Sequence, residues 1–205
     1  AERAIAFSEA AELLERVLPH VTGAHEHASL LARMGHLRWL NGEPTAGEQL
    51  LADGVARLDE LGEDIGAARA RLHLGRCRWE LDQPDAAYRD FQGARDVLEK
   101  EGPSPELALA YLRIAGIHAF QLDYGACLAA AERAAEIAEL ASADFERVWS
   151  LTHVALGHFG TSHEFEILDR CYEEALAKGY GLIAGNTLYN EIWDRVHTLT
   201  GGLDG

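Results

Sequence analysis

The apolar positions of the chain follow helical spacing along its length. Between residues 30 and 58 apolar side chains recur three or four positions apart, at Leu30, Leu31, Met34, Leu37, Leu50, Leu51, Val55 and Leu58. This spacing places them on one face of a helix. No segment shows the sustained alternation of apolar and polar residues that is typical of a half-buried strand. The pattern predicts an all-α protein.

The pattern repeats with a period of 40 residues. Trp79 follows Trp39 at that interval, and Pro84 follows Pro44. The same interval relates rows of small residues, which are Gly35, Gly75, Ala115 and Ala155; Gly47, Ala87 and Cys127; and Gly54, Ala94 and Ala134. Small side chains at a helix crossing let two backbones approach closely. Each unit is therefore expected to be a pair of antiparallel helices, A and B, with a proline in the first turn of B.

The period also predicts the layout of the chain. We expect one repeat domain over residues 1–205, as a fragment of a longer protein. A leading B helix is expected at residues 3–18 and a final A helix at residues 182–199. Four pairs are expected between them, at about 25–61, 65–100, 105–141 and 144–178. The fourth pair aligns best with one extra residue in its turn, at 160–164.

The charge balance argues against partners that carry many phosphate groups. The 205 residues contain 18 Lys and Arg against 34 Asp and Glu, which gives a net charge of −16. Nucleic acids and anionic membranes are bound by clustered cations, so neither is expected to contact this segment. No run of about 18 apolar residues could span a membrane, and glutamates stand where a signal peptide would be apolar. We therefore expect a cytoplasmic protein.

Cysteine and histidine residues give no reason to expect a metal. Cys77, Cys127 and Cys171 form no Cys-x-x-Cys pair and stand where a helix pair needs a small apolar side chain, which favours a packing role. His153, His158 and His163 are spaced by five, whereas a metal pair on one helix needs a spacing of three or four. His25 and His27 are interpreted as a solvated pair. We expect no metal, no cofactor and no catalytic residue.

The second helix pair resembles the tetratricopeptide repeat (TPR). The matching positions are Gly75, the turn 82–84, Ala87, Phe91 and Ala94. The period of 40 is longer than the standard one of about 34. It is similar to that of the elongated TPR region of large ATP-binding LuxR-type transcriptional regulators and of cyclase/ATPase fusion proteins, which the segments 31–39 and 102–108 also resemble.

The resemblance implies a right-handed α-solenoid of about ten helices, with the A helices lining a concave groove. It also implies a role in protein–protein interaction, signal transduction and transcriptional regulation. In that family the repeats sense or relay a signal, while the ATPase and DNA-binding parts lie elsewhere. The chain has no Gly-x-x-x-x-Gly-Lys-Ser/Thr loop and no helix-turn-helix segment with a basic face. We therefore expect a non-enzymatic regulatory sensor module of a larger ATPase-type protein.

A ladder of cationic and aromatic residues follows the period on the A helices. Its members are Arg33, His73, Arg113 and His153 at one position, His36 and Arg76 three residues later, and Trp39 and Trp79 at the next turn. The resemblance places these side chains in the concave groove. Arginine offers paired donors to carboxylate or phosphate. The groove is therefore expected to bind an acidic peptide, a partner domain or a small anionic effector.

Two other interpretations stay open. In the first, the arginines of the ladder pair with acidic residues of neighbouring helices and the tryptophans fill the seam between repeats, with no ligand. In the second, the chain is a structural spacer or oligomerisation array that self-associates through apolar faces of its first and last helices. Those faces contain Ile5, Leu13, Leu14 and Val17, and Leu188, Ile192 and Val196.

A second row of basic residues also follows the period, beside the turn of each pair. It consists of Arg38, Arg78, His118 and His158. Cations near the end of a helix interact favourably with its last carbonyls. This row is therefore expected to cap the A helices or to contact the neighbouring repeat, and not to form a binding site.

Overall fold

The structure is a computed structural model and describes residues 2–159 and 161–200. Within these residues it contains ten α-helices, one short 3-10 helix and no strand, so the all-α prediction is confirmed. The α-helices are α1 (Glu2–Val17), α2 (Ala24–Leu40), α3 (Pro44–Glu60), α4 (Asp64–Glu80), α5 (Pro84–Glu101), α6 (Pro105–Phe120), α7 (Tyr124–Leu140), α8 (Asp144–Gly157), α9 (Ser162–Ala177) and α10 (Gly181–Thr200). The 3-10 helix η1 (Leu18–His20) follows α1.

The helices begin and end within one residue of the ranges expected for the leading helix, the four pairs and the final helix. The fourth pair is the irregular one, because α8 has 14 residues where α2 and α4 each have 17. Gly160, in the turn expected to hold an extra residue, lies outside the described residues. Beyond that turn Leu168 and Ala175 are fully buried, as the shifted alignment requires.

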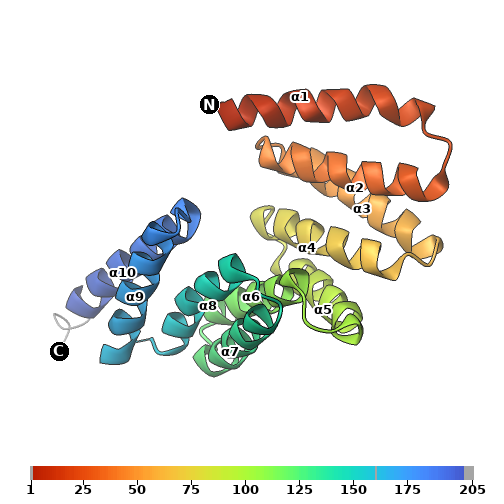
Figure 1. Cartoon of the computed structure of the whole chain (residues 1–205). Coiled ribbons are helices and arrows are strands. Elements are labelled where there is room, and N and C mark those ends of the chain that lie inside the picture. The colour runs from red at the N-terminus through yellow and green to blue at the C-terminus, as the bar shows by residue number, and fades with distance from the viewer. Residues whose placement is uncertain (1, 160, 201–205) are drawn as a thin grey trace. The chain divides into compact units, whose positions relative to one another are not determined.

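The chain divides into two compact units, Ala1–Gly102 with α1 to α5 and Pro103–Gly205 with α6 to α10. Within each unit every helix packs against the next one along the chain (Figure 1). The A helices also contact one another, α2 with α4 in the first unit, and α6 with α8 and α8 with α10 in the second. Each unit is therefore a series of helix pairs. The single repeat domain over 1–205 and the right-handed solenoid stay predictions.

The turns before α3, α4, α5, α7, α8 and α10 repeat one backbone geometry, and the turn before α6, at Gly102, differs from them. Residues with positive φ end the A helices at Gly42, Asp82 and Leu122, and end the B helices at Gly62, Gly102, Ser142 and Gly179. In the first of these turns the N–H of Gly42 donates to the Trp39 carbonyl at 2.9 Å, and the N–H of Glu43 donates to the Arg38 carbonyl at 3.0 Å. This pair of hydrogen bonds satisfies the last carbonyls of a helix. The 40-residue period therefore extends to the backbone of the turns.

The rows of small residues mark places where the two backbones of a pair touch. A Cβ atom on Gly35 would lie 2.8 Å from the carbonyl oxygen of Gly47 and 2.8 Å from the backbone nitrogen of Leu51. In the next pair the buried Phe91 ring fills this space, since a Cβ on Gly75 would lie 2.5 Å from it. The expected reason for the small residues, close approach of A to B, is thus observed.

Candidate functional site

Six residues of the predicted ladder lie on two neighbouring A helices of the first unit. Helix α2 carries Arg33, His36 and Trp39, and helix α4 carries His73, Arg76 and Trp79. Residues three apart share one side of a helix, and α2 packs against α4. We call these six side chains the α2/α4 face.

Two histidines contact each other on this face. The rings of His36 and His73 meet edge to face with their centroids 3.8 Å apart, and the Trp39 ring lies 5.4 Å from that of His36. The Nδ1 atom of His36 is buried and has no hydrogen-bond partner among the described residues. Burial lowers the pKa of His36, which favours the neutral ring. These rings therefore supply a flat contact between neighbouring A helices.

Glu80 joins two of the predicted residues and was not part of the ladder. The indole Nε1 of Trp39 donates to a Glu80 carboxylate oxygen at 2.7 Å, and Arg76 forms an ion pair with the other oxygen at 3.0 Å. The charge of Arg76 is thus balanced by its own helix, and Trp39 reaches across to the next A helix. For Trp39 the structure agrees with the interpretation of seam filling. Arg76 has an acidic partner, but on its own helix and not, as that interpretation expected, on a neighbouring one.

Arg33 differs from Arg76. Its side chain is exposed on α2, one turn before His36. No acidic side chain among the described residues lies within ion-pairing distance of it. The α2/α4 face therefore offers an anion one accessible guanidinium beside a surface of imidazole and indole rings.

The remaining two ladder residues, Arg113 and His153, lie in the second unit on α6 and α8. The guanidinium of Arg113 lies over the Trp149 ring, 4.9 Å from its centroid. His153 Nδ1 lies 3.4 Å from the Trp149 carbonyl oxygen, and a Cβ added at Gly116 would lie 3.4 Å from His153 Nε2. Burial, with a smaller contribution from the Arg113 charge, lowers the pKa of His153 to about 4.

Trp149 is the residue of this cluster that sequence reasoning missed. The 40-residue comparison detects residue types that recur, and the equivalent positions hold Ser29, Arg69 and Leu109. A cation and an aromatic ring one helical turn apart in the repeat register, on A helices that pack together, would have been the available signal.

The arginines of the second basic row contact carboxylates. The expected contact with the neighbouring repeat is observed, whereas the expected capping through carbonyls is wrong for these arginines. Arg38 pairs with Glu43 at 3.1 Å and with Glu15 of α1. Arg78 pairs with Glu48 of α3 at 3.1 Å and with Asp90 of α5 at 3.0 Å. The carbonyls at the ends of these helices already accept hydrogen bonds from backbone N–H groups. The guanidinium groups instead form ion pairs that connect successive helices.

We expect His153 to make stability depend on pH. Its folded pKa of about 4 lies below its ordinary value of 6.5, so the proton binds mainly to the unfolded chain. The stabilising effect is present above about pH 6.5 and is lost as the pH falls towards 4. Between pH 7 and pH 5 the loss should be about 2 kcal/mol.

Urea denaturation measures the free energy of unfolding of the wild type and of His153→Asn at pH 7 and at pH 5. The contribution of His153 is the extra stability that the wild type loses between the two pH values. Asparagine keeps a donor for the Trp149 carbonyl but does not titrate. His20→Asn, on the exposed η1 segment, is the matched control and should behave as the wild type does. An equal loss of stability in wild type and His153→Asn would contradict the expectation.

His158, which follows the last residue of α8, and His163 of α9 lie with their ring centroids 5.0 Å apart. One expectation about the histidines needs correction. His25 is not merely solvated, since its Nδ1 lies 3.0 Å from a Glu63 carboxylate oxygen. Among the described residues no group of three His, Cys, Asp or Glu side chains is placed to hold a metal ion.

The cysteines are buried thiols. None of Cys77, Cys127 and Cys171 forms a disulfide within the described residues. Burial raises the pKa of the Cys77 and Cys127 thiols to about 12. A thiol with such a pKa is a poor nucleophile at neutral pH, which agrees with the expected packing role.

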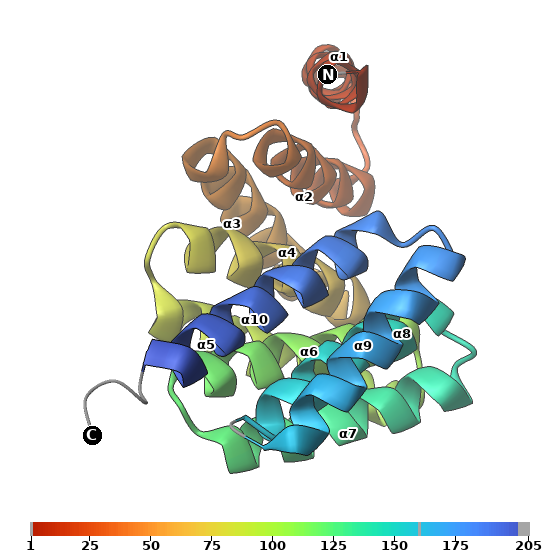
Figure 2. The same ribbon diagram turned by 90° about the vertical axis from the view of Figure 1, so that its left-hand side faces the viewer.

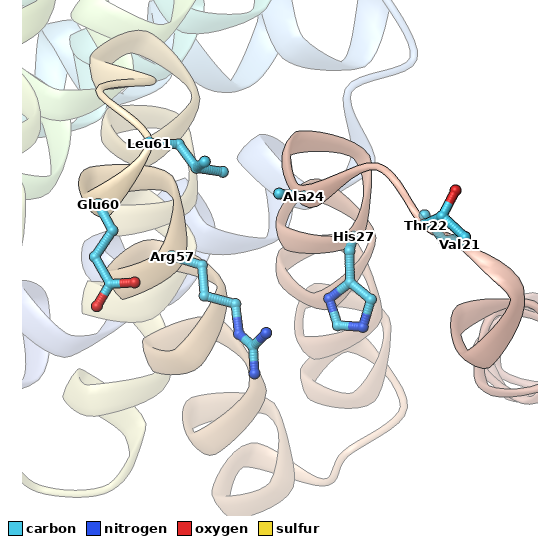
Figure 3. A pocket seen from close by; sticks show the side chains of 7 residues that line it. All are labelled: Val21, Thr22, Ala24, His27, Arg57, Glu60 and Leu61. Atoms are coloured by element: carbon cyan, nitrogen blue, oxygen red, sulfur yellow. The ribbon is translucent and has the colours of Figure 1, made fainter.

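A hollow of about 250 Å³ opens where the connection before α2 meets the end of α3 (Figure 3). It is lined by Val21, Thr22, Ala24, His27, Arg57, Glu60 and Leu61. Arg57 is paired with Asp53 at 2.8 Å, and Glu60 lies beside it, so the hollow has no surplus of one charge. It contains no residue of the predicted ladder.

Comparisons with known proteins give a fold and no function. No family model matches the chain, and no curated protein matches it. Among solved structures it is similar to the crystal structure of BtubC (BKLC) from P. vanneervenii, with a TM-score of 0.70 and 13% sequence identity over 86% of this chain and 74% of that one. At that identity the likeness concerns the helical fold alone. In the part of the chain that is described, no helix has the length and apolar character needed to cross a bilayer.

Proposed function

We propose that this chain is a non-enzymatic interaction module that binds an acidic peptide, a partner domain or an anionic effector on its A helices. In keeping with the TPR resemblance, it would serve as the regulatory sensor of a larger signalling or transcription-regulating ATPase-type protein in the cytoplasm.

The observation that carries this proposal is the pairing of an accessible cation with flat rings on the α2/α4 face. Arg33 is exposed, and His36, His73 and Trp39 beside it form a partly buried ring surface. Aromatic side chains next to an arginine are typical of residues that contribute most to protein interfaces. In the second unit a half-buried arginine, Arg113, lies over the Trp149 ring.

Binding of a fluorescent oligoglutamate peptide, followed by anisotropy, tests the proposal. Arg33→Ala should weaken binding about tenfold, the loss of one charge-assisted contact worth about 1.4 kcal/mol. The triple variant Arg33→Ala, Arg76→Ala, Arg113→Ala should weaken it further, and added salt should reduce the difference. Arg89→Ala removes the same charge from the exposed surface of α5 and is the matched control. Equal dissociation constants for wild type and triple variant, at low and high salt, would remove the A helices from consideration.

A second candidate function, a structural spacer or oligomerisation array, is favoured by a different observation. On α10 the side chains of Leu188 and Ile192 are exposed, and on α1 so are those of Leu13 and Val17. Leu14 is half-buried, and the side chains of Ile5 and Val196 lie outside the described ones. Exposed apolar faces of this kind promote self-association.

A further inference from the structure

The α2/α4 face carries two arginines, and the charge of one of them is already balanced. The two helices belong to successive pairs of the first unit (Figure 2). Arg76 pairs with Glu80 at 3.0 Å, and the same carboxylate accepts the Trp39 indole N–H at 2.7 Å. Arg33 is exposed and has no acidic partner among the described residues. An acidic peptide brings several carboxylates, so its complex with this face would be stabilised by more positive charge than Arg33 supplies.

The two histidines of the face are the side chains that can add this charge. An imidazole ring can gain a proton in mildly acidic solution, whereas an arginine is charged at every pH of interest. The rings of His36 and His73 are half-buried and meet with their centroids 3.8 Å apart. His36 stands one helical turn after Arg33, and His73 one turn before Arg76, so each histidine shares a side of its helix with an arginine. A proton on either ring would lie beside an anion bound at Arg33.

Without a ligand the surroundings oppose protonation of the pair. Nδ1 of His36 is buried and has no hydrogen-bond partner among the described residues, so a proton placed there would have no acceptor. Burial also lowers the pKa of His36. Two rings in contact repel each other when both are charged, so the pair can readily hold one proton and not two. These features favour an uncharged pair in the free protein at neutral pH.

Carboxylates on the helices that pack against α2 and α4 are bound by other arginines. They are Glu15 of α1, Glu48 and Asp59 of α3, and Asp90 of α5, and their partners are Arg38 of α2 and Arg71 and Arg78 of α4. Each of these arginines stands two or five residues from the histidine of its own helix, and therefore on another side of that helix. His20 of η1 is exposed before the first turn of α2. The groups that share the side of the histidine pair are thus Arg33, Arg76 and the Glu80 carboxylate that Arg76 binds.

We propose that the α2/α4 face takes up one proton on the His36/His73 pair when it binds an acidic peptide. This inference rests on the proposed function and adds its regulation by pH. Carboxylates of the ligand stabilise the charged ring, so the pair has a higher pKa in the complex than in the free protein. When the pKa of a group rises on binding, the affinity increases as the pH falls. The peptide is therefore held more tightly in mildly acidic solution, and above neutral pH it is held by Arg33 with the neutral rings.

Binding of the fluorescent oligoglutamate peptide to the full chain at pH 7.5 and at pH 6.0 tests the coupling. The wild type should bind about threefold more tightly at pH 6.0. The double variant His36→Gln, His73→Gln keeps polar side chains that do not titrate, so its affinity should change much less between the two pH values. His20→Gln, on the exposed η1 segment, is the matched control and should show the pH dependence of the wild type.

Isothermal titration calorimetry at pH 6.5, in two buffers with different heats of ionisation, counts the protons taken up. Protons exchanged by the peptide itself are common to both proteins, so the wild type should take up more protons per peptide than the double variant does. Histidine side-chain NMR of the wild type gives a reading that needs no variant. At pH 6.5 the ring signals of His36 or His73 should move towards those of a protonated ring when the peptide is added.

The outcomes separate this inference from the proposed function. Binding with the same pH dependence and the same proton uptake in the wild type and in a folded double variant would overturn the coupling, while the proposed function would stand. Ring signals that do not respond to a bound peptide would overturn it as well. Absence of oligoglutamate binding at both pH values would overturn both proposals. Far-UV circular dichroism at each pH establishes that the variants are folded.

Discussion

Gly35→Ala should destabilise the first unit by about 2–4 kcal/mol. The added methyl group would lie 2.8 Å from the Gly47 carbonyl oxygen and from the Leu51 backbone nitrogen. Both are backbone atoms, so no rotamer change can relieve the overlap, and α2 and α3 would have to move apart. The loss outweighs the gain of up to about 1 kcal/mol that alanine normally brings to the interior of a helix.

Urea denaturation followed by circular dichroism measures this change in the free energy of unfolding. Gly66→Ala in α4 is the matched control, because its methyl group would lie at an ordinary distance of 3.5 Å from the nearest atom, in the Leu58 side chain. That variant should be as stable as the wild type or slightly more so. Equal stability of Gly35→Ala and Gly66→Ala would show that α2 and α3 are not in backbone contact.

Phe91→Ala should cost about 3–5 kcal/mol, because it empties the space that a fully buried aromatic ring fills. The position opposite the ring is Gly75, where an added Cβ would lie 2.5 Å from a ring carbon. Gly75→Ala alone should therefore destabilise as well, by forcing the ring away from its site. The double variant should be more stable than Phe91→Ala alone, since the new methyl group then occupies part of the cavity.

A double-mutant cycle by urea denaturation measures this coupling, which should be at least about 1 kcal/mol in favour of the double variant. The second unit supplies the precedent, because its equivalent positions are Ala115 and Ala131, both fully buried. Additive effects of the two substitutions would mean that Phe91 and Gly75 do not share one space.

The helices could be predicted closely because each is specified several times over. A row such as Gly35, Gly75, Ala115 and Ala155 has one member in every helix pair, and any one of these residues sets the register of the others. How closely an A helix packs on a B helix depends on the size of the side chains between them, and residue size can be read directly from the sequence. The helices and their pairing could therefore be derived from the repeat, and the helix ends followed from the turn residues that it contains.

The candidate site could be predicted only in part. The 40-residue comparison finds residue types that recur in every helix pair, whereas a contact between neighbouring A helices depends on which two side chains meet. The ladder located Arg33, His36 and His73 correctly on adjacent helices, but it did not reveal that the two histidine rings meet. Glu80, four residues after Arg76, was available as a local pairing signal. Its second bond, to Trp39 on another helix, needed the three-dimensional register.

The arrangement of contacts within each unit has a consequence for folding. In the described residues of the first unit no helix touches another that is more than two places along the chain. Closing contacts over such short separations loses little chain entropy, so folding should be fast and can start at any helix pair. For the same reason, a destabilising substitution should affect mainly the helix pair that contains it. A helix pair loosened at Gly35 would open α2 and α3 first, while the contact between α4 and α5 holds.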